Sequence, residues 1–246
     1  MKLRDRLTEI RDFCCAHADE ARVRKYARFF TEGYDAYGLE LHQMERQRDA
    51  WLAQYGEELG LPGLLSLGDL LVRSGKYEEA SFAIWFAASR QDEFVPETLE
   101  RLGGWLERCI RNWAHTDVLC HEVLAVFFTR QIVRLEAFAG WRTSPSRWKR
   151  RAAAVVLIEA LRADVPVPRL LEFIAPMMSD EEKVVHQGLG WFLREAWKRA
   201  PKPVERFLLH WRDSCNRLII RTATEKMTAQ QKSRFKATSR KKPRSA

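Results

Sequence analysis

The fold is decided by the stretch Arg111-Asn112-Trp113-Ala114-His115-Thr116-Asp117 and by the apolar run Val118–Phe128 that follows it. If this segment is helical, a spacing of four residues places the Trp113 ring and the Asp117 carboxylate on one face, about 40° apart. The apolar residues after them require that the helix packs against other helices. The stretch therefore predicts a buried helix over residues 112–128 with an aromatic ring and a carboxylate near its start.

The same helical periodicity covers nearly the whole chain, and no segment shows the period-2 alternation of a half-buried strand. Two glycines and polar residues predict a loop over Thr31–Gly38. Antiparallel helix pairs recurring roughly every 35–45 residues predict an all-α, HEAT-like helical-repeat solenoid of about six pairs over residues 1–227, with a compact all-α bundle as the alternative. The expected helices lie at residues 3–17, 20–31, 40–54, 62–74, 77–90, 96–110, 112–128, 130–139, 145–162, 167–177, 180–199, 202–212 and 215–226.

Charge is unevenly distributed along the 246 residues, whose net charge is +9. Residues 228–246 hold seven basic residues and no acid, which leaves +2 for residues 1–227. Residues 228–246 contain few apolar side chains, so we expect a basic, disordered tail. Such a tail either adds sequence-independent attraction to phosphates or is simply solvated.

The cysteines and the apolar runs indicate the cellular compartment of the protein. There are five cysteines and no Cys-x-x-Cys, which favours a reduced, cytoplasmic protein. The N-terminus does not resemble a signal peptide, and no apolar run reaches the ~18 residues that a membrane span needs. The histidines and cysteines show no metal-ligand spacing, so no metal and no cofactor is expected.

The pair Trp113 and Asp117 has two interpretations. From spacing alone the favoured one is structural: Asn112 or Thr116 caps the helix, Asp117 complements the helix dipole, and Trp113 belongs to the core. The functional interpretation is an indole and a carboxylate presented together to a ligand. His115, between them, is expected to be a surface residue, with an auxiliary acid or base role as the alternative.

A second stretch, Ser144-Pro145-Ser146-Arg147-Trp148-Lys149-Arg150-Arg151, places four cations in the first two turns of an expected helix. Ser144 suits the N-cap and Pro145 the first helical position. Cations at this end oppose the helix dipole, each by roughly 0.3–1 kcal/mol when exposed. An anion would instead be attracted by the dipole, the free N–H groups and the arginines. The pattern favours phosphate binding over a merely charged surface turn.

A third stretch, residues 179–198, is expected to be helical, with Ser179 or Asp180 as its cap. A helical wheel places Trp191 on the polar face, beside Arg194 and Lys198. An indole flanked by cations suits a surface that meets a sugar, a base or a phosphate backbone, and packing on a neighbouring helix pair is the alternative.

These stretches resemble one known family. Asn112-Trp113-x-x-x-Asp117, Ser146-Arg147-Trp148-Lys149-Arg150-Arg151-Ala152 and Gly188-Leu189-Gly190-Trp191-Phe192-Leu193-Arg194-Glu195 look like segments of the AlkD-type DNA alkylation repair glycosylases, all-α proteins built of HEAT-like repeats. The early stretch Phe30–Gly38 is also similar. With gaps, the likeness extends from about residue 20 to residue 226.

The resemblance implies an activity and a site. The family removes N3- and N7-alkylated purines from duplex DNA without pulling the lesion into a pocket. Its catalytic aspartate and two active-site tryptophans would be Asp117, Trp113 and Trp191, and no metal or cofactor would be needed. Its DNA-contacting arginine would be Arg151, with Arg150 as the alternative. Together with these two, the expected DNA-binding residues are Arg147, Trp148, Lys149, Arg194 and Lys198. The expected partner is double-stranded DNA containing alkylated purines, bound by a monomer in the cytoplasm at the nucleoid.

Two other functions share parts of this pattern. A non-catalytic helical-repeat protein that binds damaged or branched DNA would have the same basic surface without the chemistry. A protein–protein scaffold would present a concave surface to a partner. Scaffolds of that kind favour an apolar or acidic groove, whereas Trp191 lies beside two cations.

Overall fold

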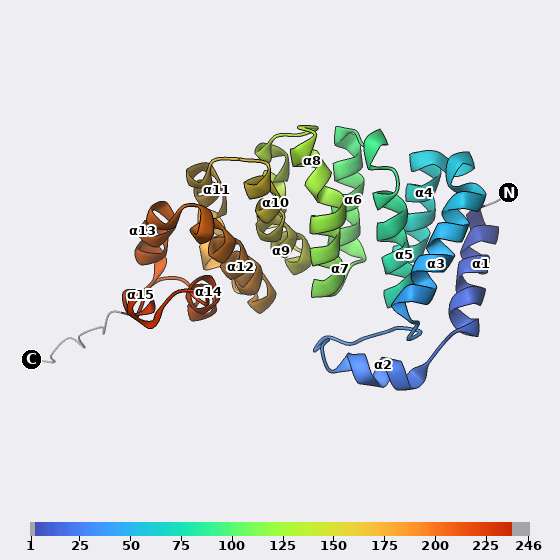
Figure 1. The fold of residues 1–246 in the computed structure, drawn as a ribbon, viewed down its shortest axis with the longest axis horizontal. Helices are drawn as coiled ribbons and strands as arrows, with labels where there is room; N and C mark the ends of the chain where they lie inside the picture. Colours follow the sequence, from blue (N-terminus) through green and yellow to red (C-terminus); the bar gives the residue numbers. More distant parts are fainter. Residues whose placement is uncertain (1–2, 238–246) are drawn as a thin grey trace, which may run out of the picture.

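The computed structural model describes residues 3–237, which form helices and no β-strand (Figure 1). The prediction of an all-α protein is confirmed. The α-helices are α1 (Leu3–Ala16), α2 (Glu20–Ala27), α3 (Leu41–Trp51), α4 (Glu57–Val72), α5 (Tyr77–Ala88), α6 (Pro96–Arg108), α7 (Trp113–Val118), α8 (Ala125–Thr129), α9 (Arg147–Val155), α10 (Leu157–Arg162), α11 (Val167–Ile174), α12 (Lys183–Arg199), α13 (Pro201–Trp211), α14 (Arg217–Ala223) and α15 (Ala229–Ser233). π-helical segments at Leu52–Gly56 and Leu119–Leu124 and 3-10 segments at Gln91–Glu93, Leu135–Thr143 and Ala175–Ser179 complete the set.

Most helices stand side by side in an arc, with the N-terminus at one end and the C-terminus at the other, and α2 lies crosswise below the row (Figure 1). One helix of each successive pair packs against the next, in the order α5, α7, α9, α12 and α14. Hydrogen bonds between neighbours in this row join residues one repeat apart: Ser81 to His115, and Asp117 to Arg151, both 34 residues. The predicted helical-repeat solenoid is therefore confirmed, because a compact bundle would not repeat its contacts at a fixed spacing.

The central helix forms as its sequence predicts. Asn112 is the N-cap of α7, and its side-chain oxygen accepts a hydrogen bond from the backbone N–H of His115 at 2.8 Å. The apolar residues that follow continue through the π-helical segment Leu119–Leu124 into α8, and Leu119, Val123 and Phe127 are completely buried. A π turn inserts an extra residue, which rotates the side chains after it relative to those before it.

Several helix boundaries differ from the prediction: α4 begins at Glu57 rather than at residue 62, and α14 begins at Arg217 rather than at residue 215. Three further differences have local reasons. The segment expected to be helical over 130–139 is a turn followed by the 3-10 segment Leu135–Thr143. Helix α9 begins at Arg147 rather than at residue 145, because the Oγ of Ser144 accepts from the N–H of Ser146 and Ser146 is the N-cap. Helix α12 begins at Lys183 rather than at residue 180, because the chain ends a 3-10 segment at Ser179 first.

The predicted start of the disordered tail at residue 228 is wrong. Thr228 caps α15 with a reciprocal capping box, and the ring of Phe235 is 1% exposed. The nitrogen Nη1 of Arg212 donates to the carbonyl of Arg234, and that of Arg217 donates to the carbonyl of Phe235. One buried aromatic ring and these bonds dock the segment, which composition alone does not reveal. The remainder of the expected tail, residues 238–246, lies outside the described residues.

Among residues 3–237 no helix is both long and apolar enough to cross a membrane.

Candidate functional site

An ion pair joins α7 to α9 at the middle of the arc. The guanidinium of Arg151 donates from Nε to Oδ1 of Asp117 at 2.8 Å and from Nη2 to Oδ2 at 2.7 Å. Its third nitrogen, Nη1, donates to the carbonyl oxygen of Val184 at the start of α12, at 2.7 Å. A Cβ added at Gly188 would lie 3.3 Å from Cγ of Arg151, so the missing side chain leaves room for the arginine. Three helices of the row thus fix this one guanidinium.

The geometry leaves Asp117 able to act on a ligand. Its side chain is 12% exposed, and that of Arg151 is 7% exposed. A carboxylate has about four lone-pair positions, and Arg151 occupies two of them. The remaining positions can accept a hydrogen bond from a water molecule or face a positive charge. Arg151 keeps only two N–H groups and little accessible surface, so its position suits holding Asp117 better than the phosphate contact expected from the sequence.

Trp113 lies on the surface, where its indole is 43% exposed. Its Nε1 donates to the carbonyl oxygen of Phe29 at 3.2 Å, and its ring stacks on Phe30 with 5.8 Å between centroids and 15° between planes. Phe30 in turn stacks on Tyr34 at 4.6 Å. The structural interpretation favoured by spacing alone, a core tryptophan, is therefore wrong: one face of the indole is held by the chain and the rest is open.

The loop that holds Trp113 is itself fixed by a buried carboxylate. Glu78, 2% exposed, accepts hydrogen bonds from the N–H of Tyr37 at 2.8 Å and from that of Gly38 at 2.7 Å. Gly38 has φ +85°, and a Cβ there would lie 2.2 Å from the carbonyl oxygen of Asp19. Only glycine fits this point. The predicted loop over Thr31–Gly38 is confirmed, and it closes against the first turns of α5 and α7.

His115 is buried beneath this loop. Asn112 Nδ2 lies 2.8 Å from its Nδ1, and the Oγ of Ser81 lies 3.0 Å from its Nε2. An amide nitrogen can only donate, so Nδ1 accepts and Nε2 carries the proton that Ser81 accepts. Burial lowers the pKa of His115 to about 4. The expectation of a surface histidine is wrong. Its 3% exposure and its two partners give it a structural role beside the site.

Trp191 is half-buried on α12 and faces the helix that carries Asp117. Its ring lies 5.1 Å from that of His121, in the π-helical segment four residues after Asp117. The Nδ1 of His121 lies 2.5 Å from a carboxylate oxygen of Glu159. The structure thus places Trp113 before Asp117 on its own helix and Trp191 across from the residues that follow it.

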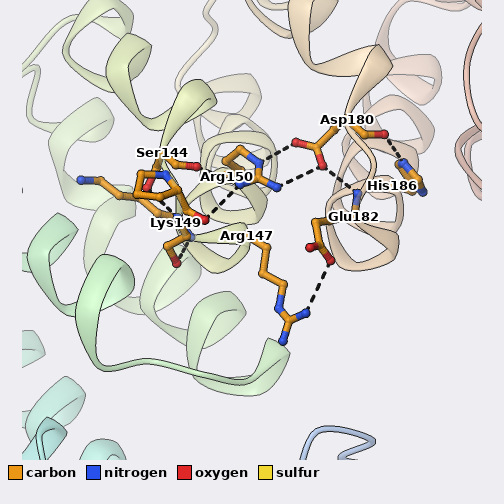
Figure 2. A network of polar contacts seen from close by, with 9 residues as sticks. Ser144, Arg147, Lys149, Arg150, Asp180, Glu182 and His186 are labelled. Carbon is orange, nitrogen blue, oxygen red and sulfur yellow. Dashed lines mark hydrogen bonds and ion pairs between the residues drawn. The ribbon is translucent and has the colours of Figure 1, made fainter.

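The four cations at the start of α9 all have carboxylate partners, two of which Figure 2 shows. Arg150 donates from Nε to Asp180 at 2.6 Å, and Arg147 lies 3.5 Å from Glu182. The remaining pairs are Arg147 with Glu32, Lys149 with Glu107, and Arg151 with Asp117. Asp180 and Glu182, which precede α12, thus neutralise cations of α9. Because these cations are paired, unmatched charge no longer supports the phosphate site expected at the start of α9.

Side-chain exposure separates the expected DNA-binding residues. Trp148 is 3% exposed and packs beneath Arg147, so its inaccessible ring has a packing role rather than the expected DNA contact. Arg194 is 20% exposed and pairs with Glu225 at 2.5 Å. Lys198 is 50% exposed, and its ion pair with Glu195 on its own helix leaves it accessible.

Sequence reasoning missed an exposed aromatic surface on α2, a helix in which no residue is buried. Tyr26 is 40% exposed and the adjoining Phe29 is 51% exposed. Lys25 lies over the Tyr26 ring at 5.5 Å and Arg28 over the Phe29 ring at 4.8 Å. Because Phe29 also accepts the indole N–H of Trp113, this surface continues the site. Helical spacing predicts that the apolar residues of α2 face the core. Only the four basic residues between 22 and 28 indicate that this helix is exposed.

No group of three or more His, Cys, Asp or Glu side chains within residues 3–237 is arranged to hold a metal ion.

Comparison with protein-family models identifies one family. A family model described as "DNA alkylation repair enzyme" matches residues 14–227. A solved structure from Enterococcus faecalis, titled a predicted DNA alkylation repair enzyme, aligns with a TM-score of 0.71 at 17% identity and covers 87% of this chain and 98% of that chain. The structure of smu.31 from Streptococcus mutans UA159 aligns with a TM-score of 0.54 at 18% identity and covers 76% of this chain and 98% of its own. At these identities the two structures show the fold. No curated protein matches the chain.

Proposed function

We propose, because the chain belongs to the DNA alkylation repair enzyme family, that it is a DNA glycosylase that hydrolyses the N-glycosidic bond of N3- and N7-alkylated purines in duplex DNA. We further propose that its repeats are HEAT-like and that it acts as a cytoplasmic monomer on nucleoid DNA. One observation carries the proposal of glycosylase activity. Asp117 is a nearly buried carboxylate, 12% exposed, held by Arg151; an exposed indole lies on its own helix and a half-buried indole lies two helices along the row.

The chemistry of these lesions needs little from the protein. Alkylation at N3 or N7 leaves the purine positively charged, so the base departs without being protonated. Positive charge then grows on the deoxyribose as the glycosidic bond breaks. A fixed carboxylate stabilises that charge more in the transition state than in the ground state, which is the condition for faster reaction.

Asp117 is the residue for this task. Its lone pairs not used by Arg151 can face the sugar and accept a hydrogen bond from the attacking water. The water adds to C1′ of the sugar, the purine leaves with the bonding electrons, and the proton of the water passes to the carboxylate or to solvent. The products are a free base and an abasic site.

The two tryptophans are proposed to flank the charged nucleotide. An indole face attracts a cation by roughly 0.5–2 kcal/mol, depending on how far the pair is removed from water. Trp113 presents an open edge that Phe29 and Phe30 hold in place. Trp191 is held against His121, within the same helical segment as Asp117.

DNA backbone contacts are proposed for the accessible cations around the pair. Lys198 and Arg194 are on α12 and Arg147 begins α9, while Lys25 and Arg28 lie over the rings of Tyr26 and Phe29. Lys149 and Arg150 are less accessible, at 15% and 17% exposed, and would reach a phosphate while keeping their acids. Arg151 acts through Asp117 and is proposed as a positioning residue.

The proposal is tested by incubating the full chain with duplex DNA that contains 7-methylguanine and measuring the free base by chromatography. A matched undamaged duplex is the control. We expect release of the methylated base alone and abasic sites in equal number. Tight binding of both duplexes with no base released would contradict the proposal and favour the non-catalytic DNA-binding alternative.

A further inference from the structure

A basic cavity of about 740 Å³ lies at the C-terminal end of the arc, between α14 and α15. Four basic side chains line it, and none of its lining residues is acidic. These four are Arg217, Arg221, Lys232 and Lys236. The floor is partly apolar and includes Ile220 and Phe235. The cavity is far along the chain from Asp117 and shares no residue with the site described above.

The docked segment creates this cavity. Phe235 is buried, and its carbonyl oxygen accepts a hydrogen bond from Arg217 Nη1 at 3.1 Å. Lys232 Nζ donates to the carbonyl oxygen of Glu225 at 3.0 Å. These bonds bring two cations from the docked segment opposite two cations of α14. Four positive charges are thereby held around one opening, which a solvated tail would keep apart.

The charges here are matched differently from those of α9. Each of the α9 cations has a carboxylate within an ion-pair distance. Arg217 and Lys232 bind backbone carbonyls, which leave their charge uncompensated. Among the described residues, Arg221 and Lys236 have neither a carboxylate nor a carbonyl partner, and both are exposed. Four cations that repel one another and lack acids are a stable arrangement when an anion joins them.

We propose that this cavity binds phosphate groups of the DNA backbone, on the flank of the duplex beyond α12. The choice of DNA as the partner rests on the proposed function. Helix α14 packs directly against α12, which carries Trp191 and Arg194, so a backbone following the row reaches α14 next. Helix α14 faces α12 with Thr222, whose side chain lies against Gly190. The cations of α9 are paired with carboxylates, so they attract a phosphate less strongly than the cations of this cavity, which lack acidic partners.

The test compares the full chain with a variant carrying Arg221→Gln and Lys236→Gln. Binding to an undamaged, fluorescent duplex is measured over a range of salt concentrations. Each lost phosphate contact is expected to lower the slope of log K against log salt by roughly 0.9, so the double variant is expected to lose about 1.8. A matched control carries Lys202→Gln and Arg206→Gln, two exposed cations of α13 that line no part of the cavity. The control is expected to keep the wild-type slope.

Two further measurements distinguish DNA binding at this cavity from binding of a free anion and from catalysis. The rate of base release at saturating protein is expected to be unchanged in the double variant, because the cavity holds the flank and not the lesion. Titration with inorganic phosphate, followed by thermal unfolding, tests for a free anion. If phosphate stabilises the wild type but not the double variant, while the DNA slopes are equal, a free anion occupies the cavity and the proposal is overturned. Equal slopes without any phosphate effect overturn it as well. If the double variant has a reduced salt slope but the wild type releases no base, the phosphate site is supported and the glycosylase function is contradicted.

Discussion

The guanidinium of Arg151 meets both carboxylate oxygens of Asp117, at 2.8 and 2.7 Å, across a separation of 34 residues. Both side chains are nearly buried, and the arginine is also tied to the carbonyl of Val184. A buried pair of this kind is costly to break, because either partner alone is an uncompensated charge. The pair therefore fixes where the carboxylate points, which is what a catalyst of charge separation requires.

Replacing Arg151 tests whether it positions Asp117 or binds phosphate. Arg151→Met is expected to slow base release by up to about 100-fold, because the carboxylate loses its fixed direction. It is expected to leave the salt dependence of duplex binding unchanged, whereas loss of a phosphate contact would lower that slope by roughly 0.9. Arg151→Lys, which keeps the charge but makes one bond instead of two, is expected to recover part of the rate. Arg150→Met is the matched comparison, since Arg150 pairs with Asp180 in the same manner. Because Arg150 is proposed to reach a phosphate, its loss is expected to lower the slope and to leave the rate at saturating protein unchanged.

Trp113 is expected to contribute to base release and to cost less stability on truncation than a core tryptophan. The residue is 43% exposed, so Trp113→Ala removes less buried area than the loss of a fully buried indole. Loss of one indole–cation contact corresponds to a decrease of roughly 2- to 30-fold in the rate of base release at saturating protein. Trp211→Ala, on α13, is the control and is expected to lower the melting temperature while leaving the rate unchanged. The reverse pattern, a normal rate with lost stability in Trp113→Ala, would show that the indole is only a packing residue.

His115 makes stability depend on pH. Burial lowers its pKa from an ordinary value of 6.5 to about 4, so the unfolded chain binds a proton that the folded chain does not. The contribution is fully present above about pH 6.5 and is lost as the pH falls toward 4, by up to about 3 kcal/mol. Urea unfolding of the wild type and of His115→Gln at several pH values measures this. The difference in stability between them is expected to shrink as the pH falls, and a constant difference would contradict the burial of a neutral histidine.

The C-terminal segment is expected to matter for stability up to residue 237. Removal of residues 238–246 keeps every contact described above, so we expect an unchanged melting temperature. Removal of residues 228–246 also takes away Phe235, whose buried ring contributes roughly 1.5–3 kcal/mol. For a domain of this size each kcal/mol corresponds to about 2–4 °C, which calorimetry resolves. Equal melting temperatures for the two truncations would show that the docked segment adds nothing.

The sequence predicts the helices well because the signals for helices are local. Apolar spacing located nearly every one, and Asn112, the observed cap of α7, was one of the two caps expected from residue type, Thr116 being the other. The start of α9 was missed by two residues, since either Ser144 or Ser146 can cap and the choice depends on a hydrogen bond between them. The 3-10 segment Leu135–Thr143 has the same apolar content as an α-helix, so periodicity does not distinguish the two.

The candidate site was harder to predict, because its ion-pair partners lie about one repeat away along the chain, or further in the case of Glu32. The cations of α9 appear unmatched along the chain, yet their acids arrive from residues 32, 107, 117, 180 and 182. Trp113 has the spacing of a core residue, and its exposure depends on where the loop around Phe30 closes. Asp117, Trp113 and Trp191 were selected only when three separate stretches resembled one family, and the match over residues 14–227 supports that family.

Asp117 is the proposed catalytic carboxylate, and one measurement tests its role most directly. Base release from a duplex containing 7-methylguanine is followed in a single turnover, with saturating protein, for the wild type and for Asp117→Asn. Asp180→Asn, which alters the carboxylate that pairs with Arg150, is the matched control. Asparagine keeps the shape and one acceptor oxygen but not the negative charge, so we predict a rate lower by roughly 100- to 1,000-fold, with folding and duplex binding retained and the control unaffected. Equal rates for the wild type and Asp117→Asn would contradict the central claim.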